Sequence, residues 1–149
     1  MIQRKQTVFL LLALVAVVVC LMMPVGAYEP AGVGAYSEIS NWFLHNTSTG
    51  RTQWTPFSLM LLLTCPFTLW AILAYNKRKL QARLCVVNMV LVLLWYAIYT
   101  FYYVITPDGM TFHIFFAACL PLVAFILFVM ARMGVKADEK LLRDADRIR

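Results

Sequence analysis

The chain contains few side chains able to bind a metal or a cofactor or to act as a nucleophile. Its two histidines, His45 and His113, lie far apart in the sequence, and with Glu38 and Asp108 they match no metal-ligand motif. No serine stands in a Gly-x-Ser-x-Gly elbow, and the four cysteines include no Cys-x-x-Cys pair. We therefore expect no catalytic residue, no metal and no cofactor, and we expect that the protein is not an enzyme.

Four long apolar runs make up most of the chain, at about residues 7–23, 57–75, 84–105 and 112–130. Each is close to the ~20 residues that cross ~30 Å of hydrocarbon as a helix. None of the four runs contains Asp, Glu, Lys or Arg. A proton-coupled transporter needs an ionisable group at such depth, so the sequence argues against this class of function.

The composition favours a membrane protein over a soluble one. Hydrophobic residues make up 62% of the chain and charged residues only 13%, whereas roughly 25% of residues are charged in soluble domains. A soluble domain of this size has too little interior to bury so many apolar side chains. We expect a single membrane domain covering residues 1–149, with lipids as partners and no nucleic-acid partner despite the net charge of +6.

The positive charges predict the orientation of the chain in the membrane. If the N-terminus lies inside and each run crosses once, twelve of the thirteen Lys and Arg residues face the cytoplasm, and only Arg51 lies outside. Because Lys and Arg resist translocation, this bias predicts a multi-pass protein with both termini in the cytoplasm. The first run, after Arg4 and Lys5, also resembles a signal peptide, but we expect it to remain as an uncleaved helix that ends at Pro24.

These features predict an all-α membrane protein, a four-transmembrane-helix bundle with both termini inside. Residues 24–56 form an outer loop between the first two helices, in which Trp42–His45 and Arg51–Trp54 flank a short turn. This pattern predicts a small outer hairpin. Residues 131–149 form a cytoplasmic tail whose charge pairs and apolar spacing predict an amphipathic helix.

Aromatic residues are concentrated in the outer half of the third run. Trp95, Tyr99 and Tyr102 are spaced i, i+4 and i+7, so they lie on one helix face. Packing against neighbouring helices is the simpler interpretation, because buried tyrosine hydroxyls need hydrogen-bond partners. The alternative is a lipid-facing aromatic groove in which these three residues bind a lipid or a quinone.

The tail combines charges of both signs with an apolar stripe, a composition typical of a docking helix. A solvated helix, or one lying on the lipid headgroups, is the simpler alternative. Because the apolar runs hold no charged residue, we expect specificity for a partner to reside in the tail. The candidate docking residues are Glu139, Leu141, Leu142, Arg143, Ala145, Asp146, Arg147 and Ile148.

The two ends of the chain carry its most specific sequence patterns. Residues 1–8 begin Met-Ile-Gln-Arg, and residues 138–149 run Asp-Glu-Lys-Leu-Leu-Arg-Asp-Ala-Asp-Arg-Ile-Arg. Both ends resemble the Bacteroidota membrane family catalogued as domain of unknown function 4293, although Leu142 and Asp144 depart from that family's usual Val and Ser. The resemblance implies four predicted spans and a location in the bacterial inner membrane, and it implies no activity.

Two classes of function remain. We expect a non-enzymatic accessory or scaffold subunit of a larger membrane protein complex, with another inner-membrane protein as its partner. The alternative is a stand-alone lipid- or quinone-binding membrane protein that uses the aromatic groove.

Overall fold

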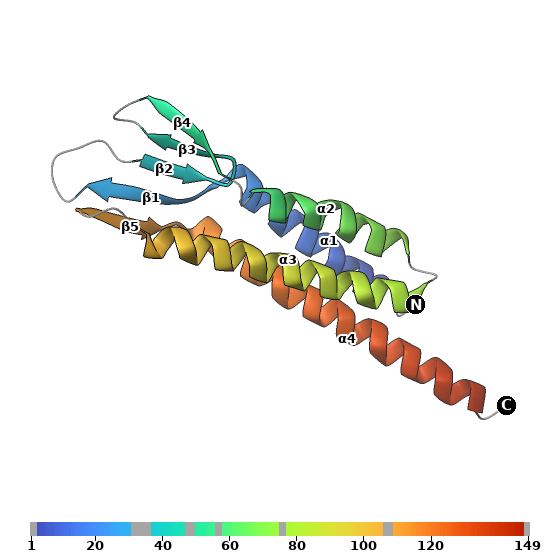
Figure 1. Ribbon diagram of the computed structural model, residues 1–149. Helices are drawn as coiled ribbons and strands as arrows, with labels where there is room; N and C mark the ends of the chain where they lie inside the picture. Colours follow the sequence, from blue (N-terminus) through green and yellow to red (C-terminus); the bar gives the residue numbers. More distant parts are fainter. Residues whose placement is uncertain are drawn as a thin grey trace.

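The structure is a computed structural model that describes residues 3–30, 37–46, 50–55, 58–74, 77–105 and 109–147. A bundle of helices forms one end of the molecule and a β-sheet forms the other (Figure 1). The helices are α1 (Gln3–Met22), α2 (Ser58–Leu73), α3 (Arg78–Val104) and α4 (Leu120–Arg147), and a short 3-10 helix, η1 (Phe116–Cys119), precedes α4. Helix α1 begins and helix α4 ends at the end away from the sheet (Figure 1).

The four helices form a ring in which α1 and α3 each contact both α2 and α4. Each helix buries one stripe of its surface, with residues three and four apart, as the 3.6-residue period requires. Several of these residues are small, which lets the helix backbones approach closely. The buried stripes include Leu10, Ala13, Val17 and Cys20 on α1 and Ala124, Phe128, Ala131 and Val135 on α4.

The sheet has five strands in the order β4-β3-β2-β1-β5, and every neighbouring pair is antiparallel. The strands are β1 (Pro24–Pro30), β2 (Ser37–Ser40), β3 (Phe43–Asn46), β4 (Arg51–Trp54) and β5 (Met110–Ile114). Four of them connect α1 to α2, and β5 comes from the connection between α3 and α4. Pairing of β5 with β1 therefore joins the two connections at this end of the bundle.

The strand register gives the sheet an inward and an outward face. Tyr28 of β1 stands opposite Ser37 of β2 and Phe112 of β5, and residues directly opposite one another share a face. Tyr28 is buried, and the ring of Phe112 packs edge-on against Tyr99 of α3, so this face lies against the helices. The residues next to these positions in each strand, such as Glu29 of β1 and His113 of β5, point to the outward face.

The predicted all-α fold is wrong, because the structure contains a five-stranded antiparallel sheet. Strands β3 and β4 form the expected hairpin, with Phe43 opposite Trp54, but β1, β2 and β5 were not predicted. Residues 112–114, assigned from the sequence to the start of the fourth apolar run, belong to β5. A short apolar segment next to a helical one carries no periodicity that separates strand from helix.

The expected number of membrane spans also needs correction. Among the described residues, two helical segments are long and apolar enough to cross a membrane, Arg78–Val104 and Phe116–Leu141. The apolar parts of the other two helices, Gln6–Met22 and Ser58–Leu73, are shorter. The prediction of four transmembrane helices is therefore wrong. Two of the described helical segments have the length and apolar composition needed to cross a membrane.

Candidate functional site

Asn41 links the sheet to the end of α1 and to α3. Its side chain is fully buried, and its Nδ2 donates a hydrogen bond to the carbonyl oxygen of Cys20 at 2.6 Å. Its Oδ1 accepts a hydrogen bond from Trp95 Nε1 at 3.0 Å. The neighbouring Trp42 donates its Nε1 to the carbonyl oxygen of Leu21 at 3.0 Å. Because the last carbonyl groups of a helix lack partners within it, these two side chains cap α1.

Two tyrosines make a second connection between α3 and the sheet. The Tyr99 hydroxyl donates to the carbonyl oxygen of Val25, and the Tyr28 hydroxyl donates to that of Tyr102, each at 2.9 Å. Tyr102 lies in the last turn of α3, so Tyr28 satisfies one of its terminal carbonyl groups. Burial, and then the neighbouring Tyr102, raises the pKa of Tyr28, which keeps its hydroxyl protonated and able to donate.

The three residues of the predicted aromatic groove lie at this same junction. Trp95 is fully buried, Tyr99 is buried, and their rings stack with centroids 5.1 Å apart. Tyr102 is partly exposed, and its backbone carbonyl accepts the hydrogen bond from Tyr28. The first two side chains therefore pack inside the protein and do not line an open groove. Binding of a lipid or quinone by this set stays a prediction.

The outward face of the sheet carries both histidines of the chain. His113 Nε2 lies 2.9 Å from Glu29 Oε2, and both side chains are more than half exposed. His45 stands opposite Glu38 in the pairing of β2 with β3. Within the described ranges, no three His, Cys, Asp or Glu side chains come together as a metal site requires. Asp108, the remaining candidate ligand, lies outside the described residues.

Polar contacts also join the helices at the end opposite the sheet. Gln6 of α1 donates its Nε2 to the carboxylate of Asp138 on α4. Arg78 of α3 donates its Nη1 to the carbonyl oxygen of Asp138 at 3.3 Å. Asp138 is buried, so it belongs to the packed bundle although the sequence placed it in a free tail. Gly134 permits this contact, because a Cβ there would lie 3.0 Å from Gln6 Cγ.

Asn88 forms a polar contact inside the bundle. Its Nδ2 donates to Thr68 Oγ1 at 3.1 Å, and the Thr68 hydroxyl donates to the carbonyl oxygen of Thr64 at 2.7 Å. Since the Thr68 proton is already used, its oxygen can only accept from Asn88, which fixes the amide orientation. Asn88 Oδ1 is buried and has no hydrogen-bond partner among the described residues, and the same holds for Arg132 Nε on α4.

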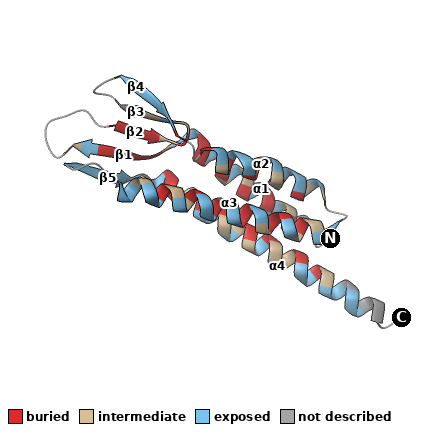
Figure 2. Ribbon diagram, viewed as in Figure 1, coloured by how far each residue is buried: buried red, intermediate tan, exposed pale blue. Residues whose placement is uncertain are grey.

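The predicted docking residues that the structure describes lie on the last, exposed part of α4. Leu141 is 60% exposed, and Arg143 approaches Glu139 to 3.8 Å one turn earlier. Figure 2 shows α4 changing from buried to exposed along this stretch. The side chains of the other five candidates lie outside the described part of the chain: Leu142, Ala145, Asp146, Arg147 and Ile148.

Comparison with protein families matches residues 2–148 to the family described as Domain of unknown function (DUF4293). The chain belongs to this family. The match confirms the resemblance seen at the two ends of the sequence, and it covers the four helices and five strands found among the described residues. No curated protein matches the chain.

Sequence reasoning missed the side chains that hold the DUF4293 domain together at its two ends. Asn41 and Tyr28 lie in a polar segment without periodicity, so nothing in the sequence indicated their contacts with the helix ends. A signal for Asp138 was available. Asp138 follows Phe128, Ala131 and Val135 at the same spacing of three and four residues. This spacing places Asp138 on the face of α4 that packs against the other helices.

Proposed function

We propose that this DUF4293 protein is a non-enzymatic accessory or scaffold subunit of a larger protein complex in the bacterial inner membrane. In this proposal the sheet lies outside, both termini lie in the cytoplasm, and α4 docks another inner-membrane protein. The observation that carries the proposal is the last part of α4, residues Glu139–Arg147, which we name the α4 extension. Its described exposed side chains are Lys140, Leu141, Arg143 and Asp144.

The α4 extension continues a helix that is packed as far as Asp138. Up to that residue α4 lies against α1, which begins at Gln3. Figure 1 shows α4 projecting beyond the ends of the other helices. This stretch continues the packed helix, and Leu141 exposes an apolar side chain on it. The projection of α4 and the exposed Leu141 side chain favour a partner protein that covers the α4 extension. This partner would pack on α4 next to α1.

Two features support the membrane placement. Apolar side chains cover the outer surface of the bundle, as illustrated by Leu11 of α1, Leu93 of α3 and Ile126 of α4, each at least half exposed. Apolar surface of this extent marks contact with lipid or with protein. Exposed basic residues gather at the end away from the sheet, which favours that end as the cytoplasmic one. These residues are Lys77, Lys79, Arg83, Lys136, Lys140 and Arg143.

The proposal is tested by co-purification from the native host in mild detergent. The full chain is compared with a chain truncated after Asp138. Because this truncation keeps the buried residues Val135 and Asp138, we expect insertion and abundance close to those of the full chain. The partner should be lost. If the truncated chain retains the same proteins at similar yield, the docking role is wrong.

A pair of point variants separates docking from a general effect on the helix. Leu141→Gln removes the exposed apolar side chain, and Lys140→Gln introduces the same residue at the adjacent exposed position. Both changes preserve helix propensity. Burial of a leucine side chain in an interface is worth about 1.5–3 kcal/mol, so Leu141→Gln should weaken the complex about tenfold or more. Equal yields for the two variants would contradict docking through this residue.

One observation favours the runner-up function, a stand-alone lipid- or quinone-binding membrane protein. An open hollow of about 430 Å³ lies at the outer end of α3, and its walls are largely apolar. Organic extraction of the purified protein, followed by mass spectrometry, tests this function. A stoichiometric lipid or quinone without any protein partner would support it over the accessory role. The lining residues are Tyr103, Val104, Met110, Thr111 and Phe112.

A further inference from the structure

Arg132 places a positive charge within the contact between α3 and α4. Its Nε is buried and lacks a hydrogen-bond partner in the described part of the chain. Arg132 lies on α4 six residues before Asp138, whose backbone oxygen accepts a hydrogen bond from Arg78 of α3. An N–H of a charged group that is removed from water and lacks an acceptor is costly. Because Nε is closed to solvent, a bound anion would stabilise this charge through the Nη groups of the partly exposed side chain.

Arg78 supplies a second guanidinium on the α3 side of the same contact. It donates Nη1 to the backbone oxygen of Asp138, while the carboxylate of Asp138 accepts from Gln6 on the α1 side. Across the described residues, neither arginine lies within 4.0 Å of a carboxylate oxygen. Both arginines are partly exposed, so an external anion can reach them.

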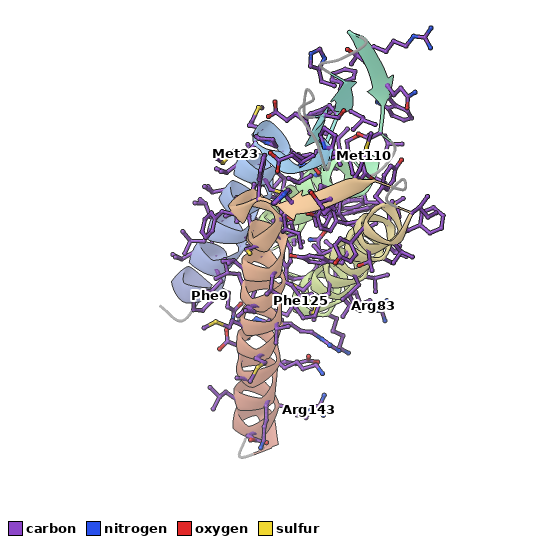
Figure 3. The ribbon with its side chains drawn as sticks, turned by 90° about the vertical axis from the view of Figure 1, so that its left-hand side faces the viewer. Phe9, Met23, Arg83, Met110, Phe125 and Arg143 are labelled. Atoms are coloured by element: carbon purple, nitrogen blue, oxygen red, sulfur yellow. The ribbon has the colours of Figure 1, made fainter. Side chains whose placement is uncertain are left out.

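The start of α3 adds to the positive potential beside this contact. The first turn of α3 contains no acidic residue, and Lys77 before it makes no side-chain cap. An uncapped helix N-terminus carries a partial positive charge from its free N–H groups. Arg83, one turn further along α3, is exposed and also basic (Figure 3).

The depth of Arg132 indicates which anion fits. From Leu84 to Tyr103, α3 contains no Asp, Glu, Lys or Arg, and this segment spans about 30 Å, the thickness of the hydrocarbon layer. Arg78 of α3 lies beside Asp138 of α4. Leu84 and Arg132 each lie six residues, about 9 Å of helix, nearer the sheet, so Arg132 lies level with the start of that segment. Arg132 therefore lies where the hydrocarbon layer meets the phosphate groups of the inner leaflet.

We propose that Arg132 and Arg78 bind the phosphate of an anionic glycerophospholipid at the α3–α4 contact. The guanidinium group matches phosphate oxygens with paired N–H donors, and basic sites between helices on the cytoplasmic side are suited to anionic lipids. The inference rests on the membrane placement proposed above and is independent of the docking partner. Its test uses purified protein without a partner, so failure of one proposal is distinguishable from failure of the other.

The experiment is native mass spectrometry of the full chain in mild detergent, titrated separately with phosphatidylglycerol, phosphatidylcholine and inorganic phosphate. We expect a one-to-one phosphatidylglycerol adduct and at least tenfold weaker binding of phosphatidylcholine. Arg132→Gln should weaken the phosphatidylglycerol adduct about tenfold or more, and Arg78→Gln should weaken it less. Arg51→Gln, which removes the same charge from an exposed position in β4, should bind like the unchanged protein.

Arg132→Lys keeps the charge but removes the paired N–H donors of the guanidinium, so its affinity should fall between those of the unchanged protein and Arg132→Gln. If Arg132→Gln fails to fold, Arg132→Lys and Arg78→Gln carry the comparison. Unchanged phosphatidylglycerol binding in these variants would overturn the proposal, and so would equal binding of phosphatidylcholine. Inorganic phosphate binding as tightly as phosphatidylglycerol would also overturn it, because the ligand would then be a free anion.

Discussion

Replacement of Asn41 by alanine tests whether side-chain caps on the helix ends fix the sheet to the bundle. Asn41 is fully buried, donates to the carbonyl oxygen of Cys20 at 2.6 Å and accepts from Trp95 Nε1 at 3.0 Å. Each hydrogen bond contributes about 0.5–1.5 kcal/mol net, and a buried group that loses its partner adds to the cost. We expect Asn41→Ala to lower the free energy of unfolding by about 2–4 kcal/mol.

A double-mutant cycle with Trp95→Phe isolates the hydrogen bond between the two side chains. Trp95→Phe alone should cost about 1–3 kcal/mol, because Asn41 Oδ1 loses the indole donor. The double variant should then lose about 1 kcal/mol less unfolding free energy than the sum of the losses in the two single variants. Unfolding in detergent micelles, followed by circular dichroism, measures all three differences.

The matched control pairs Asn41→Ala with Thr68→Val. Thr68 bonds to Thr64 and Asn88 inside the bundle and shares no hydrogen bond with Asn41. These two changes should therefore add to within about 0.3–0.5 kcal/mol. Equally additive behaviour of Asn41→Ala and Trp95→Phe would refute the role of their hydrogen bond in joining the sheet to α3.

Three further predictions concern the sheet, the bundle and the orientation of the chain. Gly26→Ala should lower the free energy of unfolding by about 1–3 kcal/mol, because the new Cβ would lie 2.9 Å from the carbonyl oxygen of His113; an unchanged thermal midpoint would contradict this. Asn88→Leu should change that free energy by less than about 1 kcal/mol, since it removes one hydrogen bond together with a buried acceptor that has no partner among the described residues; a loss of several kcal/mol would contradict this. In a cysteine-free background, Thr52→Cys should react with an impermeant thiol reagent in intact cells, whereas Ala137→Cys should react only after permeabilisation; the reverse pattern would overturn the proposed orientation.

The helices could be predicted from the sequence because their signal is local. The apolar runs at 7–23, 57–75 and 84–105 correspond to the apolar parts of α1, α2 and α3. Proline after the first run predicted the end of α1 at about the right position, and α1 ends at Met22. Each of these features depends on residues that are close together in the chain.

The sheet could not be predicted in full because its pairing is not local. The hairpin of β3 and β4 has a short turn and was found, whereas β1 pairs with β5 across more than half the chain. Met110–Ile114 is short, apolar and adjacent to a helical run, so its pattern fits either structure. Its assignment to a strand depends on backbone partners in β1 that the sequence does not identify.

The residues at the two ends of the bundle differ in how far they could be predicted. Asp138 follows the buried stripe of α4 and should have been assigned to the bundle instead of the tail. Asn41 lies in an irregular turn, and its contacts depend on where α1 ends relative to α3. Arg132 was assigned to the cytoplasmic tail, but its place at the contact between α3 and α4 depends on how these two helices pack.

Site-specific photo-crosslinking from position 141 in the native host tests the central claim most directly. A photoreactive amino acid replaces Leu141, which is 60% exposed on the α4 extension, and a second chain carries it at Thr52 on the exposed strand β4 as a control. The account predicts one discrete protein adduct from position 141, identifiable by mass spectrometry and absent from the control. Adducts with lipid alone, or no adduct while the protein is present at normal abundance, would contradict docking through α4.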